Sequence, residues 1–201
     1  TASAVEIVER IDELAARAEQ RCVAVGPALD GPTRRDGRPV SEAVTDHLFT
    51  TAVVLDQETE LQRWAEANAA RPPEGVPPQQ AAVEAIIGND PLVVVVGPAG
   101  TGKTTTTARA VGTLRAKGQP VVGLAPSGKA ADVLAVEARC PADTVAGFLA
   151  RHRSGTSPWP AGTTVILDEA AMTTTDDLAA LVDLVRRNRW RLVAIGDPAQ
   201  L

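Results

Sequence analysis

Glycine, lysine and threonine stand at fixed spacing in the middle of the chain, directly after a run of four valines. Gly97, Gly102, Lys103 and Thr104 satisfy the pattern G-x-x-x-x-G-K-[ST]. Glycines leave backbone N–H groups open to an anion because no Cβ stands in the way. A helix beginning near Lys103 would direct the positive end of its dipole at the same anion. The pattern therefore indicates a loop that binds the phosphates of a nucleoside triphosphate. The alternative is a glycine-rich turn that binds nothing.

Each position of this loop has an expected role. We expect Lys103 to reach the β- and γ-phosphates, and the Thr104 hydroxyl to bind Mg²⁺. The residues expected to contact the nucleotide are Gly97, Pro98, Ala99, Gly100, Thr101, Gly102, Lys103, Thr104 and Thr105.

Two carboxylates, Asp168 and Glu169, follow an apolar run over residues 163–167. Ligands of open parallel sheets bind at the carboxyl ends of the strands, so this pair should lie near the phosphate loop. We expect Asp168 to bind Mg²⁺ and Glu169 to polarise the attacking water, which is the division of labour that triphosphate hydrolysis needs. Alone, an Asp-Glu pair is also typical of a solvated turn or a helix cap. The loop at residues 97–104 favours the catalytic interpretation.

A third polar segment, Gly196-Asp197-Pro198-Ala199-Gln200, follows the apolar run 191–195. The amide of Gln200 could lie beside the γ-phosphate and sense whether that phosphate is present. Gly-Asp-Pro also forms an ordinary turn, so this segment alone does not decide between a γ-phosphate sensor and a plain turn.

The elements that must position these residues follow an α/β pattern. Strand-sized apolar runs cover residues 92–96, 120–125, 163–167 and 191–195. Helical patterns alternate with them over residues 79–87, 103–117, 127–138 and 175–188. Because the strands are almost continuously apolar, both faces of the sheet must be covered. The sequence predicts a parallel sheet flanked by helices.

A small, mostly helical segment is predicted before this sheet. Helical spacing covers residues 3–21 and 56–70, and the proline-rich stretch 71–78 reads as a stiff linker. We therefore divide the chain into an N-terminal helical segment (1–70), a linker (71–78) and an α/β domain (79–201).

The order of these motifs resembles the first motor domain of superfamily 1 helicases, in the RecD-like branch. Residues 125–131, Ala-Pro-Ser-Gly-Lys-Ala-Ala, resemble the Ala-Pro-Thr-Gly-Lys-Ala-Ala segment of that branch, with Ser127 in place of its threonine. Residues 142–149 resemble its Thr-Ile-His-Arg-Leu-Leu segment, with Ala146 and Gly147 replacing histidine and arginine. Residues 47–64 are similar to what precedes the motor in conjugative relaxases of the TraI/TrwC (MobF) type. The resemblance is good over residues 47–201.

This resemblance implies a P-loop NTPase with a RecA-like sheet, using ATP and Mg²⁺. It assigns catalysis to Lys103, Glu169 and Gln200. Residues 76–80 resemble the Leu-Ser-x-x-Gln motif that reads adenine, which gives that role to Gln80. The family's single-stranded DNA groove implies contacts from Ser127, Gly128, Lys129 and Thr144.

The family's motor also needs a second motor domain, whose arginine reaches the γ-phosphate. We expect a fragment truncated after the Gly-Asp-x-x-Gln motif, which alone binds ATP with little turnover. Relaxase nicking uses a tyrosine and a histidine-bound metal. The chain has no tyrosine and only His47 and His152, so nicking chemistry is not expected within it.

Composition narrows the class further. No apolar run reaches the length of a membrane span, and Cys22 and Cys140 lack metal-ligand spacing, so a cytoplasmic protein is expected. The net charge of −5 argues against a general electrostatic grip on nucleic acid but allows a local groove. Two alternatives stay open: a non-helicase P-loop ATPase or kinase, and a non-catalytic DNA-binding or scaffolding remnant.

Overall fold

The computed structural model describes residues 22–24, 49–72, 75–98, 100–152 and 158–197. The chain divides into two compact units, Thr1–Glu58 and Thr59–Leu201, which are described separately. In the first unit, β1 (Cys22–Ala24) pairs antiparallel with β2 (Phe49–Thr51). This short hairpin is not predicted from the sequence. The helix predicted over residues 3–21 lies outside the described residues.

Helix α2 (Ala52–Asn68) follows the hairpin and agrees with the helix predicted over residues 56–70. In the second unit, Leu61, Trp64 and Ala65 of this helix pack against the core of the sheet domain. Just beyond the helix, the Ala70 N–H donates to the carbonyl of Leu92 at 2.8 Å. The division of the chain at the linker 71–78 stays a prediction.

In the described part of the second unit, five parallel strands form a sheet in the order β3-β7-β6-β4-β5. The strands are β3 (Leu92–Val96), β4 (Val121–Ala125), β5 (Ala142–Thr144), β6 (Thr164–Leu167) and β7 (Arg191–Gly196). The predicted parallel α/β sheet is confirmed. Four of its strands match predicted runs to within one residue at either end, whereas β5 was not predicted.

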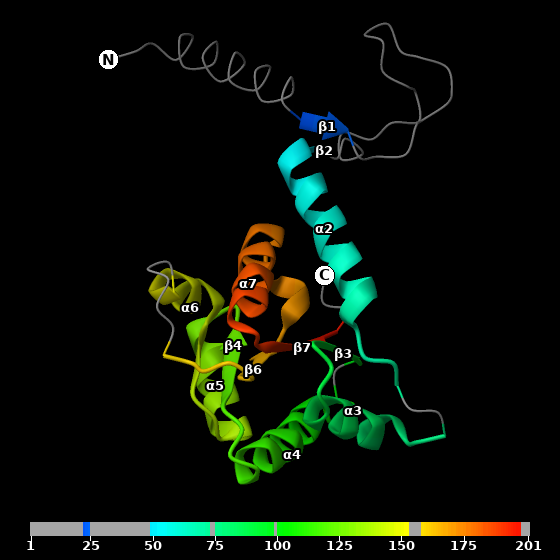
Figure 1. Ribbon diagram of the computed structural model, residues 1–201, viewed down its shortest axis with the longest axis vertical. Coiled ribbons are helices and arrows are strands. Elements are labelled where there is room, and N and C mark those ends of the chain that lie inside the picture. Colours follow the sequence, from blue (N-terminus) through cyan, green and yellow to red (C-terminus); the bar gives the residue numbers. More distant parts are fainter. Residues whose placement is uncertain (1–21, 25–48, 73–74, 99, 153–157, 198–201) are drawn as a thin grey trace, which may run out of the picture. The chain divides into compact units, whose positions relative to one another are not determined.

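Helices cover both faces of this sheet (Figure 1). One face carries α3 (Pro78–Ile87), α4 (Lys103–Ala116) and α5 (Gly128–Ala138). The other carries α6 (Val145–His152) and α7 (Thr175–Asn188). A 3-10 turn, η1 (Ala170–Met172), follows β6. None of the described helices is long and apolar enough to cross a membrane.

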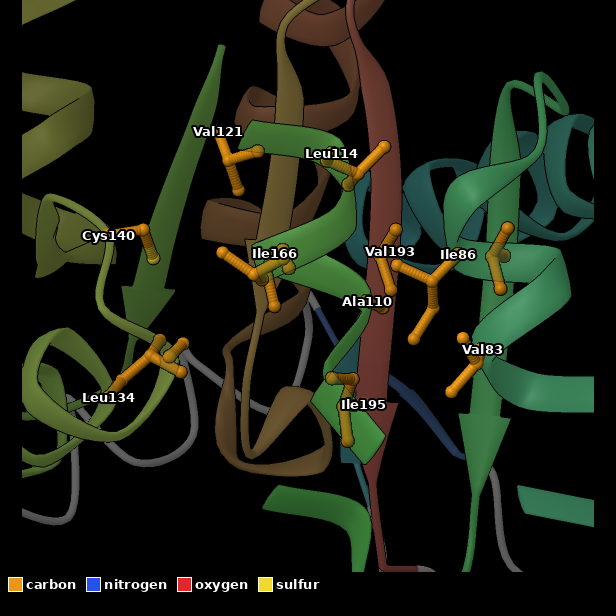
Figure 2. Packing of buried hydrophobic residues seen from close by; sticks show 13 residues of the cluster. Val83, Ile86, Ala110, Leu114, Val121, Leu134, Cys140, Ile166, Val193 and Ile195 are labelled. Atoms are coloured by element: carbon orange, nitrogen blue, oxygen red, sulfur yellow. The ribbon is translucent and has the colours of Figure 1, made fainter. Parts of the chain in front are cut away.

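The core consists of two hydrophobic clusters, one on each face, and the second also contains the aromatic residues Phe148 and Trp190. Ile166 and Val193 belong to the cluster under α3, α4 and α5, whereas Val165 and Leu192 belong to the cluster under α6 and α7. Figure 2 shows Ala110 and Leu114 of α4 among the strand residues of the first cluster. Successive strand residues face opposite sides, so both sides need apolar side chains. This is why the predicted strands read as continuous apolar runs.

Candidate nucleotide-binding site at the carboxyl edge of the sheet

Three segments with candidate functional residues meet at the carboxyl edge of the sheet because β7 lies between β3 and β6. Val96 of β3 pairs with Gly196 of β7, and Leu167 of β6 pairs with Ala194. The phosphate loop, Asp197 and the Asp168-Glu169 pair each begin directly after one of these strand ends. The backbone links the first two, since the Gly97 N–H donates to the Gly196 carbonyl at 3.2 Å.

The loop has a backbone that only glycine adopts without strain. Gly100 and Gly102 both have φ of +79°, and Gly102 is the N-cap of α4. The hydroxyl of Thr101 donates to the Pro98 carbonyl at 2.8 Å and closes the turn. The first turn of α4, which is described in full, carries no acidic side chain. An anion at this helix N-terminus would therefore meet backbone N–H groups without like-charge repulsion from that turn.

Lys103 is held at the mouth of the loop. Its Nζ donates to the Gly97 carbonyl and lies 3.8 Å from Oδ2 of Asp197. The Lys103 side chain is 21% exposed and that of Asp197 is 5% exposed. Sequence reasoning did not assign a role to Asp197. Its place in the Gly-Asp-x-x-Gln motif was the available signal, but only the glutamine of that motif was given a role.

The carboxylate pair sits on a constrained backbone. The Asp168 N–H donates to the Leu124 carbonyl of β4 at 2.9 Å, and its Oδ1 accepts from the Glu169 N–H at 3.0 Å. Glu169 has φ of +51°, in the left-handed region that side chains other than glycine rarely adopt. This conformation costs about 1 kcal/mol, and strain of this kind clusters at functional sites. Both carboxylates are partly exposed at the sheet edge.

The donor set suits a magnesium ion that arrives with a nucleotide. Among the described residues, no group of three or more His, Cys, Asp or Glu side chains could hold a metal ion by itself. Mg²⁺ needs only one or two protein oxygens, because it keeps several waters and binds the phosphates of its substrate. Thr104, exposed in the first turn of α4, and Asp168, at the end of β6, are oxygen donors of this type.

Two adjacent glutamines at the start of α3 donate hydrogen bonds to different parts of the structure. Gln80 donates to Oε1 of Glu84, one turn further along α3, at 2.8 Å. Gln79 instead donates from Nε2 to the Thr101 carbonyl of the phosphate loop at 3.0 Å. The glutamine that contacts the loop is therefore the one that sequence reasoning passed over. Gln80 as the adenine reader stays a prediction.

The residues predicted to contact DNA lie where β4 and β5 end, since Ala125 pairs with Thr144. The Ser127 hydroxyl caps α5 by accepting from the Ala130 N–H at 3.2 Å, and the Thr144 hydroxyl accepts from the Gly147 N–H at 3.0 Å. Lys129 is exposed in the first turn of α5. Both hydroxyls thus have a structural role as helix caps, and DNA contact stays a prediction.

Gly147 stands where the Thr-Ile-His-Arg-Leu-Leu segment has arginine, and the close packing around it explains this difference. A Cβ on Gly147 would lie 2.8 Å from Oγ1 of Thr144 and 3.0 Å from Oδ1 of Asp143. A larger residue here would displace the cap of α6, so this close approach favours glycine. Ala99 and Gln200 lie outside the described residues, and their roles stay predictions.

Much of the chain is similar to known proteins. Residues 76–201 match the family model of an AAA domain. The chain is 33% identical over 169 residues to a conjugal transfer protein TraA of Rhizobium radiobacter, a match that covers 84% of this chain and 14% of that protein. It is 37% identical over 123 residues to a TraA of Agrobacterium fabrum, covering 61% of this chain and 11% of that protein.

A multifunctional conjugation protein TraI of Escherichia coli is 38% identical over 121 residues, which cover 56% of this chain and 7% of that protein. The chain thus spans only a small part of the length of these relatives. It belongs to the AAA domain family, in its RecD-like helicase branch, and is homologous to conjugal transfer proteins TraA and TraI.

Proposed function

We propose that the chain is the ATP-binding motor domain of an ATP-dependent DNA helicase that translocates on single-stranded DNA, within a conjugative relaxase-helicase. The observation that carries this proposal is the position of β7 between β3 and β6. This strand order brings the phosphate loop, Asp197 and the Asp168-Glu169 pair to one sheet edge. The homology to conjugal transfer proteins adds the biological setting, and the protein would act in the cytoplasm.

The chain's own residues would divide the work of hydrolysis. The loop from Gly97 to Thr105 binds the phosphates, and Lys103 exchanges its contacts with Gly97 and Asp197 for the β- and γ-oxygens. Thr104 and Asp168 would hold Mg²⁺, which would supply positive charge to neutralise the phosphates. Glu169 accepts a proton from the attacking water and fixes its position.

DNA would bind beside the nucleotide, along the same edge of the sheet. The N-termini of α5 and α6 follow adjacent strands there, and the exposed Lys129 supplies a cation. Phosphates of a single strand can be held by such backbone N–H groups and by the lysine without reading sequence. Translocation would further require a second motor domain of the same polypeptide, so the chain alone binds ATP with little turnover.

Calorimetric titration of Mg·ATP into the wild-type chain and Lys103→Ala tests the nucleotide site. The wild type should bind, and the substitution should abolish detectable binding while far-ultraviolet circular dichroism stays unchanged. Lys117→Ala is the matched control, because Lys117 is an exposed lysine at the other end of α4. Equal affinity in folded Lys103→Ala and wild type would refute the assignment of the phosphate loop.

A further inference from the structure

Gln79 ties the phosphate loop to a neighbouring helix. Pro77 is the N-cap of α3 and Pro78 its first residue, so the start of this helix has a restricted backbone. From this first turn, Nε2 of Gln79 donates to the Thr101 carbonyl at 3.0 Å. The same nitrogen lies 3.2 Å from the position that a Cβ on Gly102 would occupy. The amide of Gln79 therefore lies against the peptide between Thr101 and Gly102.

The geometry of a peptide gives this contact a consequence for anion binding. A trans peptide is planar, and its C=O and N–H point in opposite directions. A bond that holds the Thr101 carbonyl toward α3 turns the Gly102 N–H away from α3. Glycine tolerates many backbone conformations, so nothing in Gly102 itself prevents this peptide from rotating. An external hydrogen bond is what selects one orientation.

We propose that Gln79 is a positioning residue for the phosphate loop. It fixes the peptide between Thr101 and Gly102 so that the Gly102 N–H is presented to the phosphates. This inference rests on the proposed nucleotide site and adds to it a residue outside the loop motif. Because Gln79 acts on the loop backbone, its contribution applies to any triphosphate group, whatever base is attached.

The neighbouring Gln80 provides a matched comparison. It is also exposed in the same turn of α3, but its amide donates to Glu84 on the helix surface. A base-reading glutamine would distinguish ATP from a triphosphate without a base, whereas a loop-positioning glutamine would not. The two roles therefore separate when inorganic tripolyphosphate is used as a probe beside ATP.

The experiment measures the affinity of the 201-residue chain for Mg·ATP and for inorganic tripolyphosphate by calorimetry. The variants are Gln79→Met, Gln80→Met and Gln79→Glu. Methionine keeps the length and helix propensity of glutamine but cannot donate a hydrogen bond. Since one hydrogen bond contributes a net of about 1 kcal/mol, Gln79→Met should weaken both ligands by about fivefold. Gln79→Glu should weaken both further, because its carboxylate repels the Thr101 carbonyl and the phosphates.

Gln80→Met should leave tripolyphosphate affinity unchanged, and thermal unfolding should be alike in all variants. If Gln79→Met binds both probes as well as the wild type, the inference is wrong while the nucleotide site stands. A loss confined to ATP would also overturn it, because Gln79 would then contact the base. If the wild type binds neither probe, the proposed function fails, and the inference with it.

Discussion

The ammonium of Lys103 lies 3.8 Å from the carboxylate of Asp197, and that carboxylate is almost fully buried at the end of β7. An incoming triphosphate must therefore compete with a fixed negative charge for its lysine. The pair also links the loop after β3 to the neighbouring strand, because Asp197 directly follows the residue that pairs with Val96.

Asp197→Asn should raise the affinity of the chain for Mg²⁺-free ATP. The substitution removes a negative charge that competes for Lys103 and repels the phosphates. At low salt the gain should be about threefold to tenfold, and it should shrink as ionic strength rises. Titration calorimetry at two salt concentrations measures it, with Asp183→Asn on the exposed surface of α7 as control. Binding reduced to the level of Lys103→Ala would mean that Asp197 is needed to position the lysine.

Within the proposed helicase, Glu169→Gln should separate ATP binding from hydrolysis. The amide keeps the shape of the side chain but cannot act as a base, so ATP still binds while turnover falls about a hundredfold or more. A phosphate-release assay measures the turnover. Wild-type turnover would show that another group positions the water.

Glu169→Gly should be at least as stable as the wild type although it loses the same activity. The left-handed backbone of Glu169 costs about 1 kcal/mol that glycine avoids, a gain partly offset by the larger entropy of glycine in the unfolded chain. Urea unfolding of the 201-residue chain compares the two proteins. A clear loss of stability would mean that the Glu169 side chain supports the fold rather than the reaction.

Lys129→Ala should weaken the binding of labelled oligothymidine by about threefold at low salt and reduce the salt slope by about one. Its cation lies at a helix N-terminus, which the dipole disfavours, so removing it should not destabilise α5. Fluorescence anisotropy measures the binding, with Lys117→Ala as control. Unchanged binding in Lys129→Ala would place the DNA groove elsewhere. ATP binding without any DNA binding by the wild type would favour a non-helicase ATPase.

Arg191→Met should destabilise the second unit without changing its affinity for the nucleotide. Arg191 donates from Nε to the Asp90 carbonyl at 2.9 Å and from Nη1 to the Ile86 carbonyl at 3.1 Å, which closes the end of α3. Burial lowers the pKa of this guanidinium and the Asp90 carboxylate opposes the shift, yet an arginine stays charged at neutral pH. Losing these bonds should cost about 2 kcal/mol in urea unfolding. Arg187→Met, on the exposed face of α7, should cost well under 1 kcal/mol.

The main strands could be predicted because continuous apolar runs are typical of a covered parallel sheet. The main helices could be predicted because helical patterns alternate with these runs. Strand β5 could not, since Ala142-Asp143-Thr144 is too short and polar to form such a run. The choice between Gln79 and Gln80 depends on how the first turn of α3 is rotated, which adjacent identical residues do not reveal. The Lys103–Asp197 contact depends on which strands are neighbours, and strand order cannot be derived from local patterns.

The position of β7 also has a consequence for the order in which the protein folds. Among the described strands, β7 comes last in chain order, yet it is inserted between β3 and β6. Its Gly196 pairs with Val96, far back in the sequence. Such distant pairings form slowly because a long loop must close first. A nascent chain synthesised only as far as α7 already contains the phosphate loop and both carboxylates, but β3 and β6 still lack the strand that joins them. ATP should therefore stabilise the sheet only once β7 is in place, and so act late in folding.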